Sequence, residues 1–239
     1  MKPRIQYVVL LVLLLTSLYS FSQKVVDVGK DLIATSNLFY IVNGEPVNNA
    51  KYVRVVDGSP YLNEAWADGK IILSGGRLYD NIKLRIDLVD NTLHYLTPDG
   101  TELIATTLVR SVLLKDPVTQ LFTRFDNADF IPCTIKNDKG WYQILDSGTV
   151  TVYKSYRKNI LESKPYGSAT YEQTITTNFQ YYIYKNAMLI PVVKFKQLPD
   201  MLQDKKSELQ EYIYSNNLTG KTDADYVRFI SYYNSLVKK

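Results

Sequence analysis

Short apolar stretches alternate with turn-forming residues through residues 51–196. The clearest stretch, Ile82–Val89, has apolar residues at every second position and charged residues between them. A period of two is typical of an antiparallel strand that buries one face. Similar stretches of about four to eight residues are bounded by Gly, Pro, Asn or Asp. The best delimited are Tyr52–Val56, Lys70–Leu73, Thr92–Leu96, Trp141–Leu145 and Thr149–Tyr153.

These stretches recur about every eight to twelve residues, with no convincing helix between them. This spacing favours an antiparallel meander, barrel or sandwich over a parallel α/β sheet, and the three antiparallel forms stay open. The 20 tyrosines suit such a sheet, because tyrosine packs well on a pleated surface with one wet side. We therefore predict a mainly β fold.

The pattern changes near Leu198 to that of amphipathic helices. Pro199–Asn216 combines helix-forming residues with an apolar stripe, and a second helix is expected to begin after Thr222, with acidic residues in its first turn. The stripes consist of Leu202, Leu209, Tyr212 and Ile213 in the first helix and Tyr226, Val227, Ile230, Tyr233 and Val237 in the second. Two helices this short are unstable alone, so we expect them to dock on the sheet.

The chain therefore divides into an antiparallel β domain over residues 51–197 and a helical appendage over residues 198–239, which makes it α+β overall. Residues 23–50 are ambiguous, and a strand over Leu38–Val42 is one interpretation.

Residues 1–22 have the three parts of a cleavable signal peptide. A short basic start precedes the apolar run Tyr7–Leu15, and Ser20 and Ser22 are the small residues expected before a cut at Gln23. The run is shorter than the roughly 20 apolar residues that span a bilayer, and no later run is long enough. We therefore predict a periplasmic or secreted protein with no transmembrane span after cleavage.

Charge and composition exclude several classes of function. The formal net charge of +4 falls to +2 when Lys2 and Arg4 leave with the signal peptide. A charge this small, spread along the chain, argues against nucleic acid as a partner. One cysteine and one histidine exclude an internal disulfide and any metal site with two imidazole ligands. We expect neither a metal nor a cofactor.

Three residues are candidates for catalysis, each with a structural alternative. Asp146-Ser147-Gly148 matches the signature of aspartic proteases, in which two aspartates share a proton, but the same residues favour a hairpin turn. His94 is a candidate general base, which needs a nucleophile and an orienting carboxylate nearby. Cys133 is a candidate nucleophile if His94 lies beside it, and otherwise a buried thiol.

Aromatic residues offer a candidate ligand-binding platform. Its members are Trp66, Trp141, Tyr181, Tyr182 and Tyr184. In alternating strands such residues also serve as core on one face and as cover on the other, so both interpretations stay open.

Several short motifs occur in an order that resembles a known family. They are Gly58-Ser59-Pro60-Tyr61-Leu62-Asn63, Leu93-His94-Tyr95, Gly140-Trp141-Tyr142, Lys164-Pro165-Tyr166-Gly167-Ser168-Ala169-Thr170, Leu198-Pro199-Asp200 and Asp204-Lys205-Lys206. The order is similar to that of a family of exported β-rich proteins common in Bacteroidota, and Ser22-Gln23 resembles signal cleavage sites of that phylum. The resemblance covers most of residues 58–236. It implies no activity, because none is known for the family.

Two classes of function follow. The first is a non-catalytic binding or structural module of the envelope or extracellular space, whose partner is a protein, a glycan or a lipid. Export, small net charge and tyrosine richness favour it. The second is a hydrolase with an unrecognised site at Asp146 or at His94 and Cys133. A cleft in which titratable groups converge favours the hydrolase, and a groove without them favours binding.

N-terminal sequencing of the exported protein is expected to find Gln23 as the first residue, because the small residues of the cleavage site precede it. The product should be found in the soluble fraction, since no cysteine follows the apolar run to accept a lipid. Recovery of a chain that starts at Met1 in the membrane fraction would contradict the signal-peptide interpretation.

Overall fold

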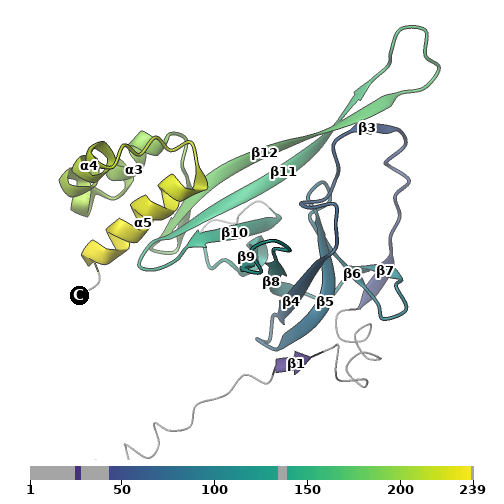
Figure 1. Cartoon of the computed structure of the whole chain (residues 1–239), viewed down its shortest axis with the longest axis horizontal. Helices are drawn as coiled ribbons and strands as arrows, with labels where there is room; N and C mark the ends of the chain where they lie inside the picture. Colours follow the sequence, from purple (N-terminus) through teal and green to yellow (C-terminus); the bar gives the residue numbers. More distant parts are fainter. Residues whose placement is uncertain (1–24, 28–42, 134–138, 238–239) are drawn as a thin grey trace, which may run out of the picture.

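The structure, a computed structural model, describes residues 25–27, 43–133 and 139–237 (Figure 1). The expected signal peptide and the candidate strand Leu38–Val42 lie outside the described residues. The described strands form one sheet of 13 strands, in the order β13-β12-β11-β10-β9-β8-β4-β5-β6-β7-β2, with β1 beside β5 and β3 beside β12. The strands are β1 (Val25–Asp27), β2 (Gly44–Pro46), β3 (Val55–Asp57), β4 (Ala67–Leu73), β5 (Leu78–Asp87), β6 (Thr92–Leu96), β7 (Glu102–Ala105), β8 (Val109–Lys115), β9 (Phe122–Asn127), β10 (Trp141–Asp146), β11 (Thr151–Ser163), β12 (Glu172–Lys185) and β13 (Met188–Pro191).

Among these strands, all neighbours pair antiparallel except β1 with β5 and β3 with β12. The prediction of a mainly β, largely antiparallel fold that ends in helices is confirmed. The strands belong to a single continuous sheet.

Six neighbouring strands, from β5 through β4, β8, β9 and β10 to β11, curl until the last meets the end of the first. At the meeting point the Lys158 N–H of β11 donates to the Leu88 carbonyl just after β5, at 3.4 Å. The inner face of this curl carries an apolar cluster that we call the strand core, because every second side chain of a strand points to the same face. Its buried members are Ile71, Tyr79, Ile82, Leu84, Ile86, Leu88, Leu93, Tyr95, Leu103, Val109, Val112, Leu114, Phe125 and Trp141.

Strands β11 and β12 form a hairpin that extends beyond the other strands (Figure 1). They pair without a register shift from Thr151 opposite Tyr184 to Ser163 opposite Glu172. Gln173 attaches the early segment of the chain to this hairpin. Its side-chain oxygen accepts from the Val53 N–H at 3.0 Å, and its side-chain nitrogen donates to the Lys51 carbonyl at 2.9 Å.

The C-terminal helices cover the same face of the sheet at its β10–β13 end. They are α3 (Leu198–Met201), α4 (Lys206–Ser215) and α5 (Asp223–Val237), with 3-10 turns at Ala128–Phe130, Phe195–Gln197 and Gln203–Lys205. None of the described helices is long and apolar enough to cross a membrane. With the sheet they bury a second cluster, the helix core: Val150, Val152, Tyr181, Ile183, Val192, Phe195, Leu198, Leu202, Leu209, Leu218, Tyr226, Phe229, Ile230 and Tyr233.

The two cores share one face of β11. Val152 belongs to the helix core, whereas Tyr156, four residues later on the same face, packs against the strand core. A third group, which we call the outer cluster, lies on the opposite face of the sheet, because Tyr153 follows Val152 directly in β11. Its buried members are Ala128, Ile131, Tyr142 and Tyr153. Each large apolar side chain buried in these clusters contributes on the order of 1.5–3 kcal/mol.

The first predicted helix is interrupted in the structure. The sequence predicts one helix over Pro199–Asn216, but α3 ends at Met201 and α4 begins at Lys206. Leu202, between them, has φ −119° and ψ 56° and is fully buried, so it turns inward to fill the helix core instead of continuing the helix.

The second helix begins where the sequence predicts. Thr222 caps it, because the Thr222 hydroxyl accepts from the Asp225 N–H at 3.3 Å. The buried stripe of α5 also includes Phe229, which the sequence analysis did not identify.

Asn234 joins α5 to the turn between β10 and β11. Its side-chain oxygen accepts from the Val150 N–H and its side-chain nitrogen donates to the Val150 carbonyl, both at 2.9 Å. Gly148 lies so close that a Cβ at this position would be 2.5 Å from the Asn234 amide nitrogen. The turn is therefore shaped to receive the helix.

We expect Asn234→Ala to lower the free energy of unfolding by about 2–4 kcal/mol, because both backbone groups of the buried Val150 lose their partner. A denaturant titration measures this change. The matched control is Asp146→Asn on the same turn. Asp146 accepts from the Ser231 hydroxyl at 2.7 Å in an exposed contact, and an amide oxygen can still accept, so we expect a change below about 0.5 kcal/mol. Wild-type stability of Asn234→Ala would show that helix docking does not depend on this contact.

Candidate functional site

The segment from Ser59 to Trp66, here the 59–66 segment, is held between β5 and β11. Two backbone hydrogen bonds join it to the end of β5. From β11, Lys158 Nζ donates to the carbonyl oxygens of Ser59 and Tyr61 at 2.8 and 2.6 Å. Burial lowers the pKa of Lys158, and the nearby acidic charges offset only part of this effect. Lys158 therefore joins the 59–66 segment to β11 through these two hydrogen bonds.

His94 lies at the centre of a hydrogen-bonded group on the face opposite the strand core. Its Nδ1 is 2.6 Å from Glu102 Oε1, and its Nε2 is 3.0 Å from Thr92 Oγ1. Arg85, opposite His94 in the β5–β6 register, donates from Nη2 to the same Glu102 oxygen at 2.8 Å. The Tyr61 ring covers His94 edge-on at 5.6 Å, which leaves His94 only 2% exposed. We call these five residues the His94 cluster.

Arg85 connects the His94 cluster to the rest of the 59–66 segment. Its guanidinium carbon lies 3.5 Å from the centroid of the Tyr61 ring and 4.4 Å from that of Trp66. Its Nη1 also donates to the Glu64 carbonyl at 3.3 Å. Stacked contacts of this kind are favourable and directional, so Arg85 sets the position of both rings.

Glu102 carries the charge of the cluster. Burial alone would raise the pKa of Glu102, but hydrogen bonds from His94 and Arg85, together with the Arg85 charge, outweigh it and hold the pKa below its ordinary value. Glu102 is therefore ionised in the folded protein at neutral pH.

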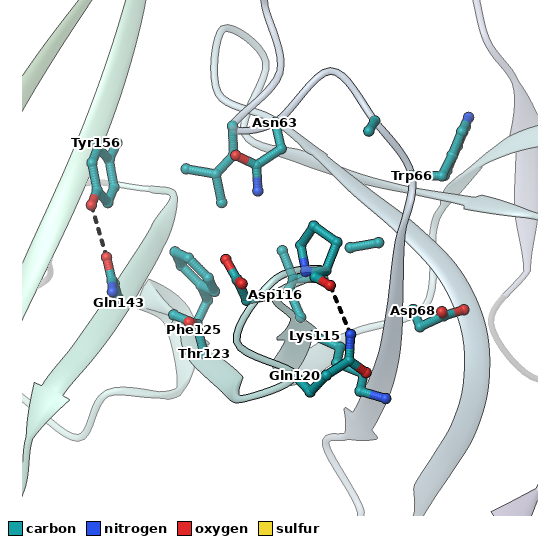
Figure 2. A pocket seen from close by; sticks show the side chains of 15 residues that line it. Asn63, Trp66, Asp68, Lys115, Asp116, Gln120, Thr123, Phe125, Gln143 and Tyr156 are labelled. Atoms are coloured by element: carbon teal, nitrogen blue, oxygen red, sulfur yellow. Dashed lines mark hydrogen bonds between the residues drawn. The ribbon is translucent and has the colours of Figure 1, made fainter.

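A pocket of about 380 Å³, which we call the mouth pocket, is lined by the 59–66 segment, the start of β4, the hairpin of β8 and β9, β10 and β11. Figure 2 shows Tyr156 and Gln143 on one side of it and Trp66 and Asp68 on the other. The lining includes Leu114 and Phe125 of the strand core, so the pocket is an opening into the curl of the sheet.

Uncharged polar groups make up much of the lining. Asn63, Gln120, Gln143, Thr123 and Tyr156 contribute amides and hydroxyls. The Tyr156 hydroxyl donates to Gln143 Oε1 at 2.8 Å, and Gln120 Nε2 donates to the Pro117 carbonyl at 2.7 Å. These bonds hold three of the polar groups in fixed orientations.

Two of the charged groups in the lining are engaged by the protein itself. Asp116 Oδ1 accepts from the N–H and hydroxyl of Thr119 and from the Val118 N–H, which lowers the pKa of Asp116. Asp68 forms an ion pair with Lys83 at 2.6 Å. Lys115 is the third charged side chain of the lining.

The structure separates the three catalytic candidates. Asp146 ends β10, where its carboxylate accepts from a hydroxyl of α5 and not from a second aspartate. Cys133 packs against the outer cluster. His94 has its contacts with Thr92, Glu102 and Tyr61, so His94 and Cys133 are not brought together.

The aromatic candidates are distributed over both faces of the sheet. Trp141 is buried in the strand core, and Tyr181 is buried in the helix core, with its ring stacked 3.7 Å from that of a tyrosine in α5. Tyr182 and Tyr184 pack against the outer cluster on the opposite face. Trp66 alone of the five lines the mouth pocket.

The partners of His94 were not predicted from the sequence. A signal for them exists, because Thr92 and His94 share a face by alternation, and the turns on both sides of β6 would place Arg85 and Glu102 beside them. The lining of the mouth pocket comes from five segments of the chain, and no local sequence pattern predicts that they come together.

Among the residues that the structure describes, no group of three or more His, Cys, Asp or Glu side chains is placed to hold a metal ion. A comparison of the chain with protein-family models, with curated proteins and with solved structures finds no match.

The low pKa of Glu102 predicts an acid-dependent loss of stability. Because its folded-state pKa lies below the unfolded value, the stability it contributes is present above the unfolded pKa and is lost as the pH falls through the folded pKa. Glu102→Gln should therefore be less stable than wild type at pH 6, and the difference should shrink below about pH 5. Denaturant titrations from pH 6 to pH 3 measure it.

The control for this prediction is Glu211→Gln, at an exposed position on α4. Its difference from wild type should stay small over the same pH range. A Glu102→Gln difference that does not change with pH would contradict the role assigned to this carboxylate.

Proposed function

We propose that the protein is an exported, non-catalytic binding module that holds a neutral glycan in the mouth pocket. The main support is the composition of the mouth pocket. Amide and hydroxyl groups line it, apolar residues form its floor, and it lies at the opening of the curled sheet. The mouths of curled β-structures are common ligand sites, and a volume of about 380 Å³ lies within the range of small-ligand pockets. Export through the signal peptide, and membership of the exported Bacteroidota family that the sequence resembles, are parts of the same proposal.

The chemistry of the lining favours a neutral ligand. Asp116 and Asp68 are already bound to other groups of the protein, so the mouth pocket has little to pair with an ionic ligand apart from Lys115. Amide side chains both donate and accept, which suits sugar hydroxyls. Trp66, held by Arg85, adds an aromatic ring at the edge of the pocket.

The His94 cluster lies apart from the mouth pocket, and this favours binding over catalysis. The His94 cluster brings an imidazole, a guanidinium, a carboxylate and a hydroxyl together, but Tyr61 covers the imidazole. None of Thr92, His94 and Glu102 lines the mouth pocket. The cluster instead contacts and positions the 59–66 segment, which forms one wall of the mouth pocket.

The ligand class is tested with an array of neutral and anionic glycans, followed by calorimetric titration of the best neutral one. Asn63→Ala and Gln143→Ala should each weaken binding about 3- to 10-fold, the loss expected for one hydrogen bond. The matched control is Gln210→Ala, an exposed amide on α4, which should bind as wild type does. Equal binding by all three variants, or binding of anionic glycans only, would contradict the proposal.

A second candidate is a hydrolase at the His94 cluster. The observation in its favour is the order hydroxyl, imidazole, carboxylate: Thr92 Oγ1 at 3.0 Å and Glu102 Oε1 at 2.6 Å from the two nitrogens of His94. This is the order of groups in nucleophilic hydrolases. Turnover of an ester or glycoside by the protein, lost in Thr92→Val with the fold intact, would establish this function in place of the first.

A further inference from the structure

One edge of β12 is open in the middle of the strand. The other edge pairs with β11 throughout its length. On the open edge, β3 pairs with Gln173 and Thr174, and β13 pairs from Tyr182 onward. Among the described residues, no strand pairs with Thr176–Gln180 on this edge, and we call this stretch the β12 notch. At its two ends, a Cβ on Gly58 would lie 2.1 Å from the Ile175 carbonyl oxygen, and the Val192 N–H donates to the Tyr181 carbonyl.

The backbone groups that face the notch can be assigned from its two ends. The Gln173 N–H donates to the Arg54 carbonyl beside β3, and the Tyr181 carbonyl accepts from the Val192 N–H after β13, both at 2.8 Å. The register with β11 has no shift between these residues. Alternate residues therefore direct their N–H and C=O outward, and within the notch these include Thr177 and Phe179.

The notch lacks the features that protect edge strands. Both Thr177 and Phe179 are exposed, and the Phe179 side chain is 56% exposed. No proline and no charged residue occurs in β12 between Glu172 and Lys185. Proteins usually guard an exposed edge with charge, proline or a bulge, because an unpaired edge attracts another strand.

We propose that the β12 notch binds a short extended peptide of a partner protein as an added antiparallel strand. At about 3.3 Å per residue, Thr176–Gln180 spans roughly 13 Å, which suits a peptide strand of about five residues. The β12 strand of a second copy does not fit, because its 14 residues would run into the positions that β3 and β13 occupy. An antiparallel ladder is slightly more stable per residue than a parallel one.

The residues around the notch indicate which side chains a bound peptide would carry. A hollow of about 320 Å³ beside it is lined by Ser155, Arg157, Asn178, Gln180 and Tyr182, together with Phe179. The amide and hydroxyl groups among them suit an amide or hydroxyl side chain. On the other face, the exposed Phe179 ring lies edge-on to Tyr181 and suits an apolar side chain. The partner segment therefore alternates apolar residues with amide or hydroxyl residues.

The test selects a phage-displayed library of random nine-residue peptides on the full protein and measures the affinity of the enriched peptides after synthesis. We expect the enriched sequences to alternate as described. Thr177→Pro, which removes an outward N–H but no bond to β11, and Phe179→Lys, which puts a charge on the edge, should each weaken binding at least 10-fold. N-methylation of every second peptide residue should abolish binding in one phase of the alternation and preserve it in the other.

The matched control, Gln210→Ala on α4, should bind the peptides as wild type does. If Thr177→Pro fails to fold, Phe179→Lys and the N-methylated peptides still decide the question. Failure to enrich any peptide, or enriched peptides that bind all variants equally, would overturn the proposal. So would a dimer in light scattering that Phe179→Lys dissociates, because the notch would then belong to a second copy of the chain.

Discussion

Two apolar clusters lie on the same face of one sheet, and neither a flat sheet nor the helices alone could bury both. The strand core is covered because β5 to β11 curl round it, and the helix core is covered because α3, α4 and α5 dock beside it. Strand β11 belongs to both arrangements, since Val152 contributes to one core and Tyr156 to the other. The position of the mouth pocket follows from this division, because it opens on the strand-core side of the same strand.

Arg85 connects the His94 cluster to the 59–66 segment, which forms one wall of the mouth pocket. Arg85 binds Glu102 on the buried side and holds the rings of Tyr61 and Trp66 on the other. The His94 cluster has the residue types of a catalytic site, and it also fixes the position of the 59–66 segment. In the function that we propose, the buried imidazole under Tyr61 supports the wall and does not contact the ligand.

The alternation of Ile82–Val89 was enough to predict a strand with one buried face, and β5 covers Leu78–Asp87. The long hairpin was predicted only in part. From Lys154 to Asn159, polar side chains occupy both faces of β11, so the period of two is hidden even though pairing with β12 continues. The bond between Asn234 and Val150 joins residues 84 positions apart, and the mouth pocket joins five segments. Such contacts arise from the curl of the whole sheet, and no local pattern encodes them.

The attachment of Gln173 to the early segment has a consequence for the order of folding. Its bonds to Val53 and Lys51 span 120 and 122 residues. Closing a loop of that length costs chain entropy before any contact is gained, and such non-local contacts slow folding. During synthesis the segment around β3 has no partner strand until β12 has emerged. Strand β3 therefore stays unpaired on the ribosome until β12 is made, whereas β4, β5, β6 and β7 can pair with one another as soon as they emerge.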